Sequence, residues 1–69
     1  MNKNSSTPAQ RSYIESLAKK FTMMDLETIL KPAFAINSNS FNNSQNLNQN
    51  LKRLNKTAAS RCIEILKGV

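Results

Sequence analysis

Apolar residues recur at helical spacing near the start of the chain. The first stripe falls at positions i, i+3, i+4 and i+7 and consists of Ile14, Leu17, Ala18 and Phe21. This spacing places all of them on one face of an α-helix, the face that a globular protein buries. Arg11, Glu15 and Lys19 lie four residues apart on another face, where we expect exposed ion pairs.

The segment before this stripe carries the signature of a helix start. The Thr7 hydroxyl can accept the N–H of Gln10, while the Gln10 side chain can reach back to the N–H of Thr7. Pro8 suits the first helical position because its missing N–H would have no partner there in any case. The sequence therefore predicts a helix that begins at Thr7.

A second apolar stripe predicts a helix from about Thr22 or Met23 to Leu30. Its apolar face contains Met23, Leu26, Ile29 and Leu30. Asp25 lies in the first turn, where a negative charge interacts favourably with the helix dipole. The helix should end before Pro32, since the residue that precedes a proline disfavours the α conformation.

The apolar segment 33–36 follows this proline. It is either one turn of helix or an extended strip, and we expect it to tuck Phe34 and Ile36 under the helices.

Residues 37–50 form an uncharged tract of Asn, Ser and Gln in which Phe41 and Leu47 are the only apolar residues. This composition is typical of a flexible linker or an adaptable binding loop. The alternative requires no function, because A/T-rich codons encode Asn, Lys and Ile, and an A/T-rich genome enriches them. Leu47, Leu51 and Leu54 indicate that helix resumes late in the tract.

The last helix should run from Lys56 to about Lys67, with Asn55 as its N-cap. Its inner line consists of Ala59, Ile63 and Leu66. Gly68 stands at the expected C′ position after the last turn.

Together these elements predict an all-α fold, a small three-helix bundle with a flexible Asn/Ser-rich middle segment at residues 37–50. Residues 1–6 should be a disordered polar tail and residues 7–69 a single domain. The first and last helices should pack through Ile14, Leu17, Phe21, Ala59, Ile63 and Leu66, and the middle helix should close the third side. A chain of 69 residues has a thin core, so a homodimer is a further way to gain stability.

Composition argues against an enzyme and against cofactor or metal sites. The chain has no histidine and one cysteine, so the commonest general base, a disulfide and a structural zinc site are all missing. Asp25 and Glu27 lie two residues apart and do not share a helix face. A single glycine, Gly68, leaves no glycine-rich phosphate loop. Cys62 lies among apolar residues and is expected to be a small buried hydrophobe.

The longest apolar run, residues 33–36, is far too short to span a bilayer. Residues 1–6 are polar and no apolar h-region follows them. We therefore expect a cytoplasmic protein with no membrane partner.

Ten Lys and Arg against four Asp and Glu give a net charge of +6, which favours an anionic partner, either nucleic acid or an acidic protein surface. The candidate binding residues are Lys52, Arg53, Lys56, Arg61, Lys19 and Lys20. An exposed Tyr13, Phe34 or Phe41 could stack on bases. The alternative is a basic face that only keeps the protein in solution.

Two stretches of the chain follow a known pattern. The first, T-x-x-Q-x-x-x-I-x-x-L-A, is matched by Thr7, Gln10, Ile14, Leu17 and Ala18. The second, L-[ST]-x-x-x-A-S-x-x-I-x-x-L, is matched by Leu54, Ala59, Ser60, Ile63 and Leu66, with Asn55 in place of Ser or Thr. The chain thus resembles a helical module of small phage and bacterial proteins, which also occurs in larger nucleic-acid-associated chains. The resemblance implies a phage or mobile-element origin, hence a host-cytoplasm location.

Three functions are consistent with these observations. The first is a nucleic-acid-associated accessory or regulatory protein that contacts phosphates. The second is a small phage-type protein that inhibits a host protein by binding an acidic surface of that host protein. The third is an assembly subunit that oligomerises through exposed Met24, Phe34 and Phe41.

Overall fold

The computed structural model describes residues 5–69, and the first four residues of the predicted polar tail lie outside that range. Five α-helices make up the described chain, of which three have seven or more residues: α1 (Pro8–Ala18), α2 (Met23–Ile29), α3 (Lys31–Ile36), α4 (Leu47–Lys52) and α5 (Lys56–Lys67). No strand occurs within residues 5–69. The predicted all-α class is confirmed.

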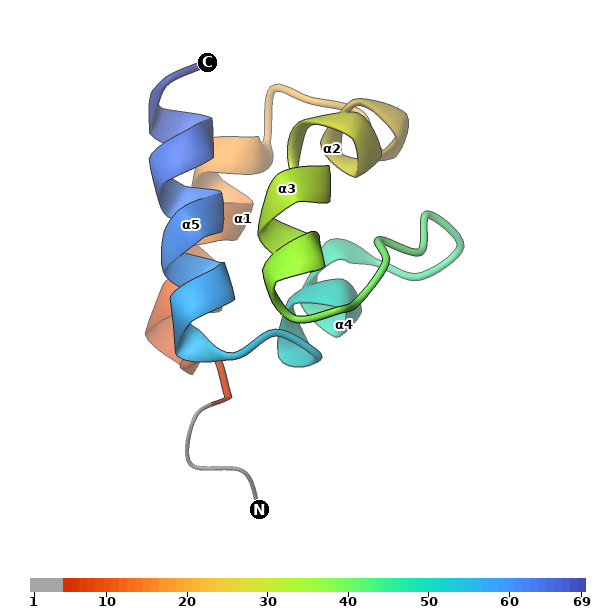
Figure 1. Ribbon diagram of the computed structural model, residues 1–69. Helices are drawn as coiled ribbons and strands as arrows, with labels where there is room; N and C mark the ends of the chain where they lie inside the picture. The colour runs from red at the N-terminus through yellow and green to blue at the C-terminus, as the bar shows by residue number, and fades with distance from the viewer. Residues whose placement is uncertain (1–4) are drawn as a thin grey trace.

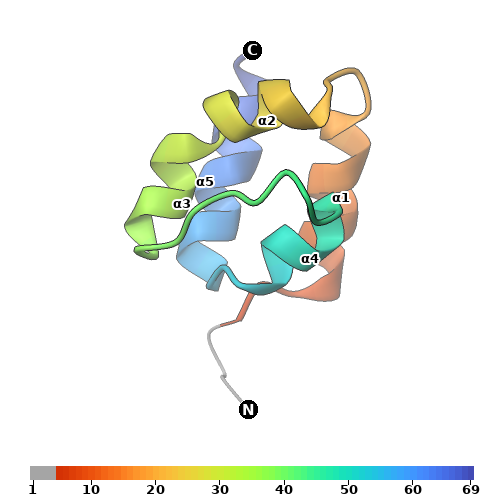
Figure 2. The same cartoon turned by 90° about the vertical axis from the view of Figure 1, so that its right-hand side faces the viewer.

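Three helices form the walls of the molecule. α1 and α5 lie side by side and run in the same direction, and α3 packs along α5 in the opposite direction (Figure 1). α2 lies across one end of these walls. α4 and the segment before it cover the open side between α1 and α3 (Figure 2).

The longest helices begin where their caps were predicted. Thr7 and Gln10 form both hydrogen bonds of a capping box, each 3.0 Å long. Thr22 and Asp25 form a second box, with the Thr22 hydroxyl 3.1 Å from the N–H of Asp25. The Oδ1 of Asn55 accepts the N–H of Ala58 at 2.8 Å and starts α5. Local side-chain chemistry therefore sets these three starts.

Residues 33–36 belong to a helix, because Pro32 lies in the first turn of α3 instead of leading into an extended strip. Leu30 joins the two helices: its N–H donates to Leu26 and its carbonyl accepts from Phe34. Phe34 is 1% exposed, as expected, but Ile36 is 49% exposed. The expected burial of Ile36 is wrong because residues two apart point to different sides of a helix.

The core is formed by residues from every helix and from the segment between α3 and α4. Its buried members are Ile14, Ala18, Leu26, Leu30, Ala33, Phe34, Phe41, Leu51, Leu54, Ala58, Ala59, Cys62 and Leu66. The predicted packing of α1 on α5 is confirmed, with Leu17, Phe21 and Ile63 half-buried at its edge. The helix that packs on α5 as the third wall, however, is α3 and not α2. α2 contributes Leu26 to the core from the end of the molecule that it crosses.

The Asn/Ser-rich segment packs on the core at defined points. The Phe41 ring meets the Phe34 ring edge-on, with centroids 5.3 Å apart, and Asn50 is fully buried. Helix resumes at Leu47, as the leucine spacing predicted, although Leu54 lies beyond α4. The flexibility of residues 37–50 stays a prediction.

The first described residues, Ser5 and Ser6, contact the end of α4 and the turn after it. Ser5 forms an isolated antiparallel bridge with Asn55. Ser6 is buried, its N–H donates to the Leu54 carbonyl at 2.9 Å, and its hydroxyl donates to the Leu51 carbonyl at 2.7 Å. This short segment therefore joins the start of the described chain to the end of α4 and to the turn after it.

The longest described helix, α5, has 12 residues, and none of the helices within residues 5–69 could cross a bilayer.

Candidate functional site

The turn between α4 and α5 brings three of the candidate basic residues together. Lys52 is the last residue of α4, Arg53 is its C-cap, and Lys56 is the first residue of α5. All three side chains are exposed. The turn between the two helices is short and held at two points. Leu54 is buried in the core, and Asn55 caps α5.

Arg11 adds a fourth positive charge at this end of the molecule. Its Nη1 donates to the carbonyl of Ser6 at 2.5 Å and to the Ser6 hydroxyl at 3.3 Å, and Ser6 is bonded to Leu51 of α4. The expected ion pair with Glu15 is not formed. We call the group of Arg11, Lys52, Arg53 and Lys56 the basic pole.

Asparagine side chains brace the backbone of the basic pole. The carbonyl of Arg53 accepts Nδ2 of Asn39 at 3.2 Å, and the N–H of Asn55 donates to Oδ1 of Asn37 at 2.5 Å. The guanidinium of Arg53 donates to Oδ1 of Asn50. The uncharged tract thus fixes the turn that carries the charges without introducing carboxylates beside them.

The remaining candidates lie elsewhere. Arg61 is farther along α5 and pairs with Glu64 at 3.1 Å, both exposed. Lys19 and Lys20 follow the far end of α1, which is about 16 Å long with its 11 residues. The Nζ of Lys20 lies 5.4 Å from the centre of the Phe21 ring. The six predicted residues therefore form two separate groups and one exposed ion pair.

The acidic residues leave the basic pole uncompensated. They are Glu15, Asp25, Glu27 and Glu64, and none belongs to α4 or to the turn after it. Between Glu27 and Glu64 the chain carries five basic residues and no acidic one. Asp25 and Glu27 lie on α2, which crosses the opposite end of the walls (Figure 1).

Two of the three aromatic candidates for base stacking are buried. Phe34 is 1% and Phe41 is 7% exposed, whereas Tyr13 is 46% exposed. The expectation that Phe34 and Phe41 could form an exposed surface is wrong, because they pack on each other in the core. Of the residues proposed for oligomerisation, Met24 alone is exposed.

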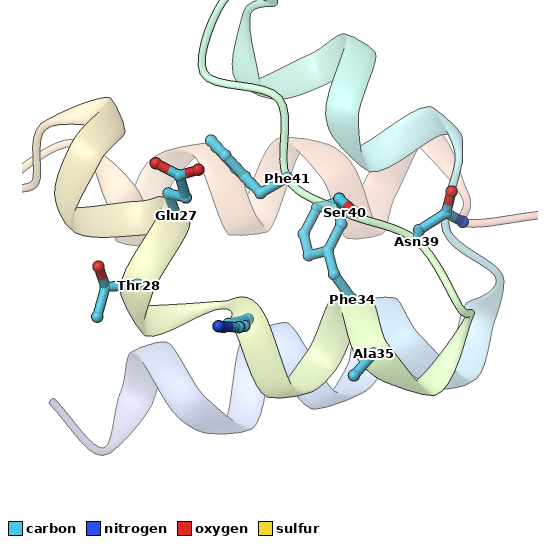
Figure 3. A pocket seen from close by; sticks show the side chains of 8 residues that line it. Glu27, Thr28, Phe34, Ala35, Asn39, Ser40 and Phe41 are labelled. Carbon is cyan, nitrogen blue, oxygen red and sulfur yellow. The ribbon is translucent and has the colours of Figure 1, made fainter.

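A pocket of about 390 Å³ lies between α2, α3 and residues 39–41 (Figure 3). It is lined by Glu27, Thr28, Lys31, Phe34, Ala35, Asn39, Ser40 and Phe41. The Glu27 carboxylate accepts Nδ2 of Asn43 at 3.1 Å. Sequence reasoning missed this pocket because it exists only when the Asn/Ser-rich segment folds back over α3.

Cys62 is fully buried in α5, as expected. Burial raises the pKa of its thiol to about 12, since a thiolate there would lose its hydration. The thiol is therefore protonated at neutral pH, and a protonated thiol is a poor nucleophile.

The chain matches no model of a known protein family, no curated protein and no solved structure. The resemblance of its two ends to a phage module stays a prediction. In the structure, Thr7 and Gln10 of that pattern form a cap, and Ile14, Ala59 and Leu66 are buried in the core.

Proposed function

We propose that this protein binds nucleic acid, as an accessory or regulatory module, through phosphate contacts made by the basic pole. The observation that carries the proposal is the clustering of Arg11, Lys52, Arg53 and Lys56 at one end while all four carboxylates of the chain lie outside α4 and its following turn. Cations without local counter-charges are the usual electrostatic footprint of a phosphate-binding surface.

The local structure supports phosphate binding in two further ways. The asparagine bonds to the turn hold its backbone in place, so that less conformational entropy is lost when a phosphate binds. The positive end of the α5 dipole also lies at the basic pole, next to Lys56.

The test is a titration of dye-labelled single-stranded and duplex oligonucleotides at two salt concentrations. If all four cations meet phosphates of a duplex, the logarithm of the binding constant should fall with the logarithm of salt concentration with a slope of about −3.6. Affinity should then drop on the order of 100-fold between 50 and 200 mM salt.

A matched pair of variants separates the basic pole from net charge. K52E/K56E reverses two charges at the pole, and K19E/K31E reverses two exposed charges outside it. The first variant should weaken binding at least about 10-fold and reduce the salt slope by about 2, while the second should have a much smaller effect. Equal effects of the two variants, or no binding at low salt, would refute the proposal and leave an acidic protein surface as the next partner to test.

A further inference from the structure

The exposed tyrosine lies on the surface where α1 meets α5. Gln10, one turn before Tyr13, donates from Nε2 to the Lys56 carbonyl at 3.4 Å and to the Ser60 hydroxyl at 3.3 Å. These bonds fix how α1 is aligned with α5. Tyr13 and Leu17 continue along the Gln10 side of α1, and Ile63 continues along the Ser60 side of α5.

We call the surface formed by Gln10, Tyr13, Leu17, Lys56, Ser60 and Ile63 the seam. Because α1 and α5 run in the same direction with the same rise per residue, their alignment at Gln10 persists along the seam. Leu17 and Ile63 are half-buried against the core and form its apolar floor, beside which Tyr13 stands 46% exposed.

The seam continues directly into the basic pole. Lys56 belongs to both, as the first residue of α5. Side chains of a helix lean toward its N-terminus, so the Tyr13 ring covers the turn that contains Gln10 and leans toward the pole. An aromatic side chain thus lies next to the cations of the basic pole, and none of the six residues of the seam is acidic.

We infer that the nucleic acid is single-stranded and that Tyr13 stacks on one of its bases while the basic pole holds the adjoining phosphates. This inference rests on the proposed function. A duplex keeps its base faces stacked inside the helix, whereas a single strand offers them to an aromatic side chain. Phe34 and Phe41 are buried, so Tyr13 is the aromatic side chain that stands beside the pole.

Tyr13 can be observed directly. The chain has one tyrosine and no tryptophan, so intrinsic tyrosine fluorescence reports on this residue alone. Titration with oligo-dT should quench it, while a duplex at equal occupancy should not.

Three probes separate stacking from charge. Y13A should bind oligo-dT roughly 10-fold more weakly than the wild type, and Y13F, which keeps a ring, should stay within about 3-fold. An abasic strand of the same length, which keeps the phosphates and lacks the bases, should bind the wild type and Y13A equally. Far-UV circular dichroism checks that both variants keep the helical content of the wild type.

The outcomes distinguish a failure of the stacking inference from a failure of the proposed function. Salt-dependent binding of oligo-dT with unchanged tyrosine fluorescence, or with Y13A equal to the wild type, would overturn the stacking inference and leave the proposed function standing. If neither strand nor duplex binds at low salt, both proposals fail together.

Discussion

The side chain of Asn50 is paired with the main chain of Asn42 in both directions. Its Oδ1 accepts the N–H of Asn42 at 2.7 Å, and its Nδ2 donates to the carbonyl of the same residue at 2.9 Å. Nδ2 also lies within hydrogen-bond distance of the carbonyls of Gln45, at 3.3 Å, and Asn46, at 3.0 Å. One buried amide therefore organises the loop that precedes α4.

Replacing Asn50 by alanine should destabilise the protein by about 2–3 kcal/mol, because the loop would lose partners for one N–H and several carbonyls. Urea unfolding followed by far-UV circular dichroism measures the loss. Gln49→Ala is the matched control, since it removes an exposed amide from the adjacent position of α4 and should change the free energy of unfolding by less than about 0.5 kcal/mol. An equal loss of unfolding free energy in the two variants would show that the loop does not depend on Asn50.

The role of Asn50 explains why the Asn/Ser-rich segment was hard to interpret from the sequence. Its composition is the same for a disordered linker and for a loop held by amide side chains, because both need polar residues without charge. The burial of Phe41 and Asn50 is set by distant residues, including Phe34 of α3. No local periodicity marks such contacts.

The end of α3 contains a strained position. Ser38 has a φ of 55°, in the left-handed region. Its N–H donates to the Ala35 carbonyl and the N–H of Asn39 donates to the Phe34 carbonyl, each at 3.0 Å, which is the Schellman arrangement that normally places glycine here. Ser38→Gly should therefore raise stability by about 0.5–1 kcal/mol.

Ser40→Gly is the control for this substitution. Ser40 is exposed, in the same loop, and does not have a positive φ, so glycine there should only increase the entropy of the unfolded chain and lower stability slightly. Thermal unfolding of both variants measures the difference. A Ser38→Gly protein that melts below the wild type would contradict the assigned backbone conformation.

The helices with strong local signals were predicted well, and the way they assemble was predicted less well. Thr7 and Asn55 cap their helices as expected because capping depends on residues within one turn. The choice of α3 over α2 as the third wall depends on how Ala33 and Phe34 are buried together with residues of α5. That choice is a tertiary effect, and the spacing of apolar residues in α2 alone does not reveal it.

Ser6 connects the N-terminal segment to α4. Ser6→Ala removes the 2.7 Å bond to the Leu51 carbonyl and one acceptor of Arg11, so it should cost about 1–2 kcal/mol. Ser12→Ala, at an exposed position of α1, should be neutral or slightly stabilising because alanine favours helix. Urea unfolding of the pair tests the assignment, and a Ser6→Ala protein as stable as Ser12→Ala would refute it.

The candidate site shows the same division between local and distant effects. Lys52, Arg53 and Lys56 are close in sequence, so their clustering could be predicted. Arg11 could not be placed there, because the contact that brings it to the pole runs through Ser6 and the end of α4. Lys20 is a candidate by charge alone, and only the direction of α1 shows that it lies at the end opposite the basic pole.

Cys62 makes stability depend on pH in the alkaline range. The pKa of its thiol is about 12 in the folded protein against 9.0 as the ordinary value, because burial penalises the thiolate. Below pH 9 the thiol is protonated in both states, so it adds no pH dependence. Between pH 9 and 12 the unfolded chain loses a proton that the folded protein keeps, and stability should fall by about 1.4 kcal/mol per pH unit from this group.

Urea unfolding from pH 8 to 11 measures the slope of the free energy of unfolding against pH. The Cys62→Ala variant supplies the slope without the thiol, and the difference between the two proteins isolates Cys62. Equal slopes, or a folded thiol that iodoacetamide alkylates at pH 8 as fast as the urea-unfolded one, would contradict the burial that the fold assigns to this residue.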